Sequence, residues 1–148
     1  GIARAKELGG SILNVGAVGI GNIISRTATI EGSTPCDIHP GQGMDYCNIA
    51  QAMSYADKQF NVVFASHVLE HVKPQEVQNA LSEFQRIGTH VIIVLPHPFA
   101  WTFYLAKGHQ SQIIKNGSVL SVRNNFIYNN ISEHYIIEFN SNVIEVFQ

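Results

Sequence analysis

The residues with the clearest chemistry in this sequence are a run of glycines and a later aspartate. The run N-V-G-A-V-G-I-G-N spans residues 14–22, and Asp37 follows Gly21 by 16 residues. Glycines let a backbone turn sharply and approach a ligand closely, and the amides of such a loop attract an anionic group. A carboxylate beside the loop can accept hydrogen bonds from both hydroxyls of an adenosyl ribose. Together the two features predict an adenosine-containing cofactor, without saying which one.

A parallel sheet is needed to bring these residues together, and the hydrophobic pattern predicts one. Apolar runs alternate with amphipathic stretches, as in a sheet covered by helices. We expect strands at 11–15, 35–38, 44–47, 60–66 and 90–95, with helices at 20–27, from Pro74 up to Gly88, and at 101–106. Further β-like runs lie at 118–122, 135–139 and 143–147. The expected fold is α/β, a Rossmann-like doubly wound and mostly parallel sheet with an antiparallel C-terminal strand pair, in one domain over residues 1–148.

Composition narrows the partners and the location. The 148 residues are 45% hydrophobic and 14% charged, with a net charge of −2, so neither a nucleic-acid footprint nor a basic membrane patch is expected. The longest apolar run, Val91–Leu95, is too short to cross a bilayer. The beginning of the chain does not resemble a signal peptide, so we expect a cytoplasmic protein; because it starts at Gly1, it can also be part of a longer one. Cys36 and Cys47 fall in expected strands, which favours buried free thiols.

The stretch from Asp37 to Val72 carries the most specific pattern. It begins D-I-H-P-G-Q-G-M-D-Y-C-N-I-A-Q and ends F-N-V-V-F-A-S-H-V-L-E-H-V. This resembles the class I S-adenosylmethionine-dependent methyltransferases, in particular the type 11 small-molecule group, whose fourth strand reads F-D-V-V and is followed by V-L-E-H-V. The resemblance covers roughly residues 11–98. It implies S-adenosylmethionine as the cofactor and an unidentified small molecule as the methyl acceptor.

Position by position, the resemblance implies a set of cofactor-binding residues. Asp37 would hold the ribose hydroxyls, and Ile38 would lie against the adenine. Asn48 would accept a hydrogen bond from the adenine amino group, and Ile49 would pack on the other face of the ring. The loop under the methionine part of the cofactor would be formed by Gly16, Ala17, Gly19 and Gly21.

The end of the fourth strand would border the methionine moiety and the acceptor, through Ser66 and His67. Methyl transfer from a sulfonium is an in-line displacement, in which the protein positions the nucleophile and excludes water. A general base is needed only where the nucleophile must lose a proton. His67 and His71 are the candidate catalytic residues, with His97 and His109 near the same edge; for each, a structural role stays open.

Two acids that are usual in the family are asparagines here, Asn14 before the glycine loop and Asn48 after the third strand. The site would then be less negative than usual for a cationic sulfonium. This leaves open a catalytically inactive module that keeps the fold as a binding scaffold. An NAD(P)-dependent oxidoreductase would explain the loop and Asp37 but not the V-L-E-H segment.

The segment His67–His71 also matches H-x-x-E-H, a pattern of one class of zinc peptidases, with Glu145 as a conceivable third ligand. That chemistry needs both histidines one turn apart on a helix. Here the motif follows a β-like run directly, and Pro74 predicts that the helix begins only after it. Zinc hydrolysis is therefore the weaker alternative, and no metal is expected.

Overall fold

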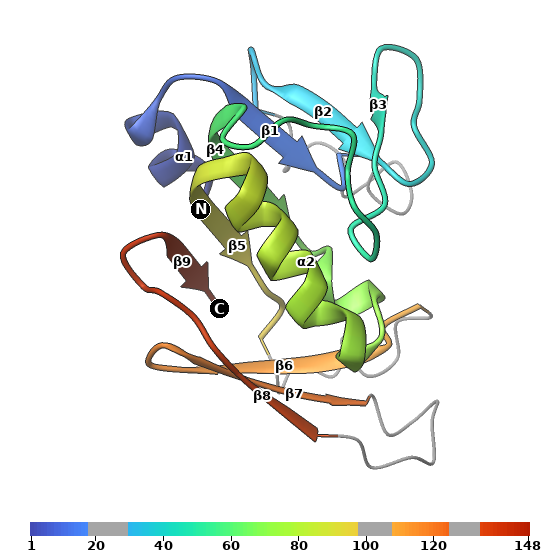
Figure 1. The fold of residues 1–148 in the computed structure, drawn as a ribbon, viewed down its shortest axis with the longest axis vertical. Coiled ribbons are helices and arrows are strands. Elements are labelled where there is room, and N and C mark those ends of the chain that lie inside the picture. Colours follow the sequence, from blue (N-terminus) through green and yellow to red (C-terminus); the bar gives the residue numbers. More distant parts are fainter. Residues whose placement is uncertain (18–29, 98–107, 125–133) are drawn as a thin grey trace.

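A parallel sheet forms the centre of the molecule (Figure 1). The computed structural model describes residues 1–17, 30–97, 108–124 and 134–148. Within these residues, six strands pair in the order β3-β2-β1-β4-β5-β9, and every pair is parallel. The strands are β1 (Ile12–Val15), β2 (Thr34–Asp37), β3 (Asp45–Tyr46), β4 (Phe60–Ser66), β5 (Gly88–Val94) and β9 (Ile144–Phe147). The predicted α/β, Rossmann-like fold is confirmed.

Alternate residues of the central strands face two separate layers of core. Val62 and Phe64 of β4 pack with helix α1 (Ile2–Leu8), through Ala5. Val63 and Ala65 belong to the larger core cluster, which also contains the apolar residues of α2 (Pro74–Ile87). Because side chains alternate across a strand, an unbroken apolar run such as β4 is what a strand covered on both faces requires. The sheet is therefore doubly wound.

Helix α2 has the bounds that its sequence predicted. It begins at Pro74, and the carboxylate of Glu76 accepts a hydrogen bond from the N–H of Lys73 at 3.0 Å. Its buried face carries residues at helical spacing, including Phe84, which is fully buried. Gly88 caps the helix but is extended (φ −115°), and β5 begins there at once. Space, rather than a left-handed turn, requires glycine at this point, since an added Cβ would lie 2.6 Å from Val63.

The last third of the chain forms a second, antiparallel sheet below the first (Figure 1). Its order is β6-β7-β8, with β6 at Ser111–Asn116, β7 at Val119–Asn124 and β8 at His134–Glu138. The antiparallel pairing expected near the C-terminus is present, but it lies in this separate sheet, and β9 joins the main sheet in parallel beside β5. The inner face of the small sheet, which includes Leu120 and Ile137, is apolar and joins the core cluster that contains α2. Burial of that face stabilises the second sheet against the rest of the core.

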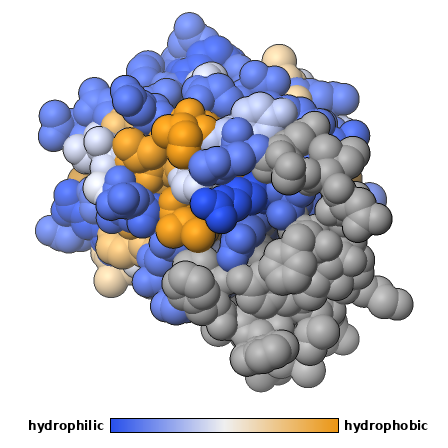
Figure 2. All heavy atoms as spheres, turned by 90° about the horizontal axis from the view of Figure 1, so that it is seen from below, coloured by the Kyte–Doolittle hydropathy of each residue, from blue (hydrophilic) through white to orange (hydrophobic). Residues whose placement is uncertain are grey.

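The outer face of the second sheet is partly apolar. Figure 2 shows this side of the molecule, with an apolar patch among polar residues. Ile136 of β8 is 60% exposed and lies in register with Ser121, which is in register with Ile114. Among the described residues, no helix is long and apolar enough to cross a membrane.

Three elements were not predicted, namely α1, β6 and the short 3-10 helix at Leu69–His71. The ion pair between Arg4 of α1 and Glu145 of β9, at 2.9 Å, ties the two ends of the chain together. It also occupies the acid that the zinc alternative used as a third ligand. The helices predicted at 20–27 and 101–106 lie outside the described residues.

Candidate functional site

The carboxyl ends of the parallel strands share one edge of the main sheet, and the described candidate residues lie along it or in the loops that follow. Strand β1 pairs with β2 on one side and with β4 on the other. The chain therefore leaves β1 toward one half of the sheet and reaches β4 on the opposite half. In doubly wound sheets, this reversal of strand order is where ligands bind.

The glycine loop starts at Gly16, directly after β1, with φ +72°. Its N–H and that of Ala17 donate hydrogen bonds to the carbonyl oxygen of Cys36 at 2.9 and 3.2 Å. A Cβ on Gly16 would run into the side chain of Val68. Glycine is thus required here both by conformation and by space. Two other predicted loop residues lie outside the described part of the chain, Gly19 and Gly21.

Asp37 is the last residue of β2, and its side chain is mostly buried, with the residue 7% exposed. Its Oδ1 accepts a hydrogen bond from the N–H of His39 at 2.9 Å, and its carbonyl oxygen accepts one from the N–H of Cys47 at 3.0 Å. The residue before it, Cys36, anchors the start of the glycine loop. The structure therefore brings the carboxylate of Asp37 beside that loop and fixes its orientation.

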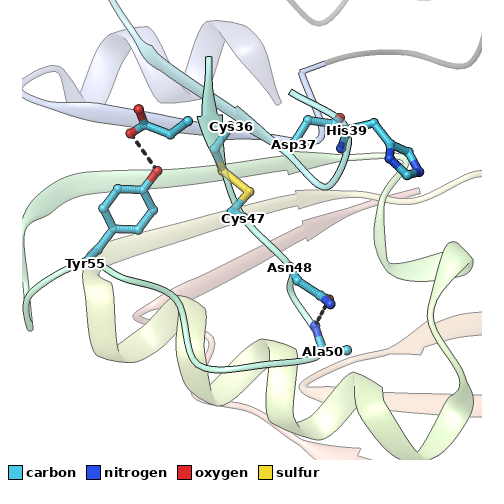
Figure 3. The surroundings of a disulfide bond; sticks show 8 residues. Cys36, Asp37, His39, Cys47, Asn48, Ala50 and Tyr55 are labelled. Carbon is cyan, nitrogen blue, oxygen red and sulfur yellow. Dashed lines mark hydrogen bonds between the residues drawn. A yellow bond between two sulfur atoms is a disulfide. The ribbon is translucent and has the colours of Figure 1, made fainter. Parts of the chain in front are cut away.

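A disulfide joins Cys36 and Cys47, so the expectation of free thiols is wrong. Both residues are buried, as expected. Strands β2 and β3 are parallel, with Asp37 in register with Tyr46, so Cys47 directly after β3 lies near Cys36. The two Cα atoms lie 5.6 Å apart, within the usual range for a disulfide. Asp37 and Asn48 each follow one of the bonded cysteines (Figure 3). The bridge thereby holds these two candidate residues near each other.

The predicted adenine-binding residues differ in exposure. Ile38 is 48% exposed, whereas Ile49 is 6% exposed and belongs to the core cluster. Asn48 is half-buried, and its Oδ1 accepts a hydrogen bond from the N–H of Ala50 at 3.0 Å (Figure 3). An amide oxygen has two lone pairs, so one remains for a ligand.

At the end of β4, Ser66 is followed by His67 in a left-handed conformation, φ +55°. The N–H of His67 donates to the carbonyl oxygen of Val94 at 2.9 Å, which holds this turn against β5. Nδ1 of its half-exposed ring lies 3.4 Å from Oε1 of Glu70. The Glu70 carboxylate raises the pKa of His67, against the opposing effect of partial burial. The structure thus pairs an imidazole with a carboxylate at the candidate site.

The other candidate histidines lie further along the same loops. His71 is in a short 3-10 helix, η1 (Leu69–His71), rather than an α-helix, as Pro74 predicted. Its Nδ1 lies 3.1 Å from the carbonyl oxygen of Gly108, and its ring meets that of His109 edge to face at 4.8 Å. His97 is exposed, beyond β5. The sequence did not reveal that Glu70 would be buried between these histidines, although it stands in the V-L-E-H motif.

With this geometry in view, comparison with known proteins gives a family for the centre of the chain. Residues 33–90 match a family model described as a methyltransferase domain, type 11. Over these residues the chain is similar to that methyltransferase family. It runs from the start of β2 into β5 and contains Asp37, Asn48, Ser66 and the V-L-E-H motif. The fold around it is accordingly a Rossmann-like methyltransferase fold.

Solved structures and curated sequences add little to the methyltransferase assignment. The PH0226 protein from Pyrococcus horikoshii OT3, known from a crystal structure, is 14% identical to this chain. The match covers 88% of this chain and 68% of that one, with a TM-score of 0.47. No curated protein sequence matches the chain significantly.

Proposed function

We propose that this protein binds S-adenosylmethionine and transfers its methyl group to a small-molecule acceptor. The observation that carries the proposal is the position of Asp37, a buried carboxylate at the end of β2 beside the start of the glycine loop. The type 11 methyltransferase match, which includes Asp37, supports the same cofactor.

The described residues fit the parts of this cofactor. Asp37 offers a carboxylate, and the two oxygens of a carboxylate can accept hydrogen bonds from two ribose hydroxyls. The exposed side chain of Ile38 offers an apolar surface to the adenine. Oδ1 of Asn48, which accepts one hydrogen bond from Ala50, can accept a second from the adenine amino group.

Bound S-adenosylmethionine supplies a methyl group on a positively charged sulfur. The protein then has to orient the acceptor, exclude water and take up any proton that the acceptor loses. His67 fits the last task because the carboxylate of Glu70 lies beside its ring and raises its pKa above the ordinary value. Ser66 lies beside it at the end of β4. A base at this position suits acceptors whose hydroxyl or amine group loses a proton when it is methylated.

Calorimetric titration of the full chain with S-adenosylmethionine tests the proposal, with NADH as the competing ligand. We expect binding of the first and none of the second. Asp37→Asn keeps an acceptor for the N–H of His39 but removes the charge, and hydrogen bonds to a charged group contribute about 1.5–3 kcal/mol. The affinity should therefore fall about 10- to 100-fold.

Asp45→Asn is the matched control, since Asp45 stands on the neighbouring strand and accepts its hydrogen bond from Tyr55 at 2.9 Å. Its affinity should equal that of the unmodified protein. Binding of NADH instead, or equal affinity in Asp37→Asn and Asp45→Asn, would contradict the proposal. Binding of neither ligand would favour a scaffold without catalysis.

A further inference from the structure

Glu70, His71 and His109 form a cluster, of which the methyl-transfer proposal uses only the contact between Glu70 and His67. Glu70 and His71 are consecutive in η1, while His109 comes 38 residues later, just before β6. One possible ligand atom from each residue lies within 4.8 Å of those from the other two. We propose that these three side chains bind a divalent transition-metal ion, a proposal that does not depend on binding of S-adenosylmethionine at Asp37.

The buried carboxylate is the first argument. Glu70 is 1% exposed, and within the described part of the chain neither of its oxygens accepts a hydrogen bond. Its one described cationic neighbour is His67, with Nδ1 at 3.4 Å from Oε1. Burial of a carboxylate is costly unless it is paired or bound to a metal. Since a carboxylate has two oxygens, it can contact His67 and still bind an ion.

The orientation of His71 is the second argument. Its Nδ1 lies 3.1 Å from the carbonyl oxygen of Gly108, and a carbonyl can only accept a hydrogen bond, so Nδ1 carries the proton. In the neutral ring, Nε2 then has the lone pair that a metal needs. Metal-binding histidines almost always donate their other N–H in this way, to a backbone carbonyl or a carboxylate.

The third argument is that the fold holds the two halves of the cluster together. Gln110 donates from its backbone N–H to the carbonyl oxygen of Glu70 and from its side chain to that of His71, both at 2.7 Å. Ser111 donates from Oγ to the carbonyl oxygen of Val72 at 2.6 Å. These bonds fix the start of β6 against η1, and with it His109 beside His71. Such support from the backbone is what a preorganised site needs.

The ligand set determines which metal fits. One carboxylate and two imidazoles are typical of zinc and of other first-row transition metals, while magnesium and calcium prefer oxygen ligands. Zinc–nitrogen distances of about 2.0–2.1 Å place tetrahedral ligands about 3.4 Å apart. The observed limit of 4.8 Å requires side-chain movements of roughly 1 Å on binding. Three protein ligands leave at least one position for water or an acceptor oxygen.

The site also differs from the zinc-peptidase arrangement. That arrangement uses both histidines of H-x-x-E-H on an α-helix and the glutamate as a base. Here the first histidine, His67, contacts the glutamate, η1 is a single 3-10 turn, and His109 supplies the second imidazole.

Titration of the chelator-treated full chain with zinc chloride, without any cofactor, tests the proposal. We expect one equivalent to bind. Glu70→Gln, which keeps the shape of the side chain, and His109→Ala should each weaken binding by more than the 10- to 100-fold that loss of an outer partner costs. His134→Ala is the control, because His134 lies exposed on β8 against Ser121, outside the cluster.

Asp37→Ala should keep the full zinc affinity, so failure of the cofactor proposal leaves this result unaffected. Circular dichroism confirms that each variant is folded. The proposal is overturned if the protein binds no zinc, or if both Glu70→Gln and His109→Ala bind it as tightly as His134→Ala does.

Discussion

Reduction of the Cys36–Cys47 disulfide should destabilise the protein by an amount that follows from the size of the loop it closes. The two cysteines are 11 residues apart in sequence. In the chain-entropy model, a loop of this length restricts the unfolded state by about 9 cal/mol/K, which is about 3 kcal/mol at 25 °C. The native contacts of β2 and β3 remain in the reduced protein, so we expect it to stay folded with this lower free energy of unfolding.

Urea denaturation followed by far-UV circular dichroism, with and without a reductant, measures the effect. With an m-value of about 2 kcal/mol/M, the midpoint should fall by about 1.5 M on reduction. The double variant Cys36→Ala/Cys47→Ala should unfold at the same midpoint in both conditions. The reasoning is refuted if the urea midpoint of the unmodified protein is also the same with and without the reductant. It is refuted as well if mass spectrometry of the unreduced protein finds two free thiols. Disulfides are rare in the cytosol, so the thiol state also bears on the cytoplasmic location expected from the sequence.

Three further predictions concern the core and the candidate base. Gly88→Ala places a Cβ 2.6 Å from Val63 and should lower the free energy of unfolding, measured by urea denaturation, by about 1–3 kcal/mol. Val63→Ala in the same protein should remove the clash, so the two variants together should cost less than the sum of their separate effects. Strictly additive effects would contradict this contact. Phe84→Ala removes a fully buried ring from α2 and should cost about 3–5 kcal/mol; a loss below 1 kcal/mol would contradict its place in the core. The His67–Glu70 contact raises the pKa of His67, so its contribution to stability is full below about pH 6.5 and is lost as the pH rises through the raised pKa. An NMR titration should show a lower His67 pKa in Glu70→Gln, and equal values would refute the pairing.

The main sheet was predictable because its strands carry strong local signals. Strand β4 is an apolar run with buried residues on both faces, and α2 begins at a proline and repeats its apolar residues at helical spacing. The position of Asp37 beside the glycine loop followed from parallel pairing alone. The sequence therefore predicted the strands of the main sheet and the edge at which the cofactor is proposed to bind.

The features that were missed depend on contacts that the local sequence does not encode. Strand β6 opens with Ser111 and Gln112, which are polar but buried, so the apolar pattern of a strand is hidden. Ser111 is accommodated because its hydroxyl donates to the carbonyl oxygen of Val72. The disulfide and the approach of His109 to Glu70 likewise follow from how distant segments pair.

The central claim is that Asp37 holds the ribose of S-adenosylmethionine. A crystal structure of the full chain with S-adenosylhomocysteine tests it most directly. We predict both ribose hydroxyls within hydrogen-bonding distance of the Asp37 carboxylate, with the adenine against Ile38. A nucleoside bound elsewhere, or a ribose without contact to Asp37, would contradict the account.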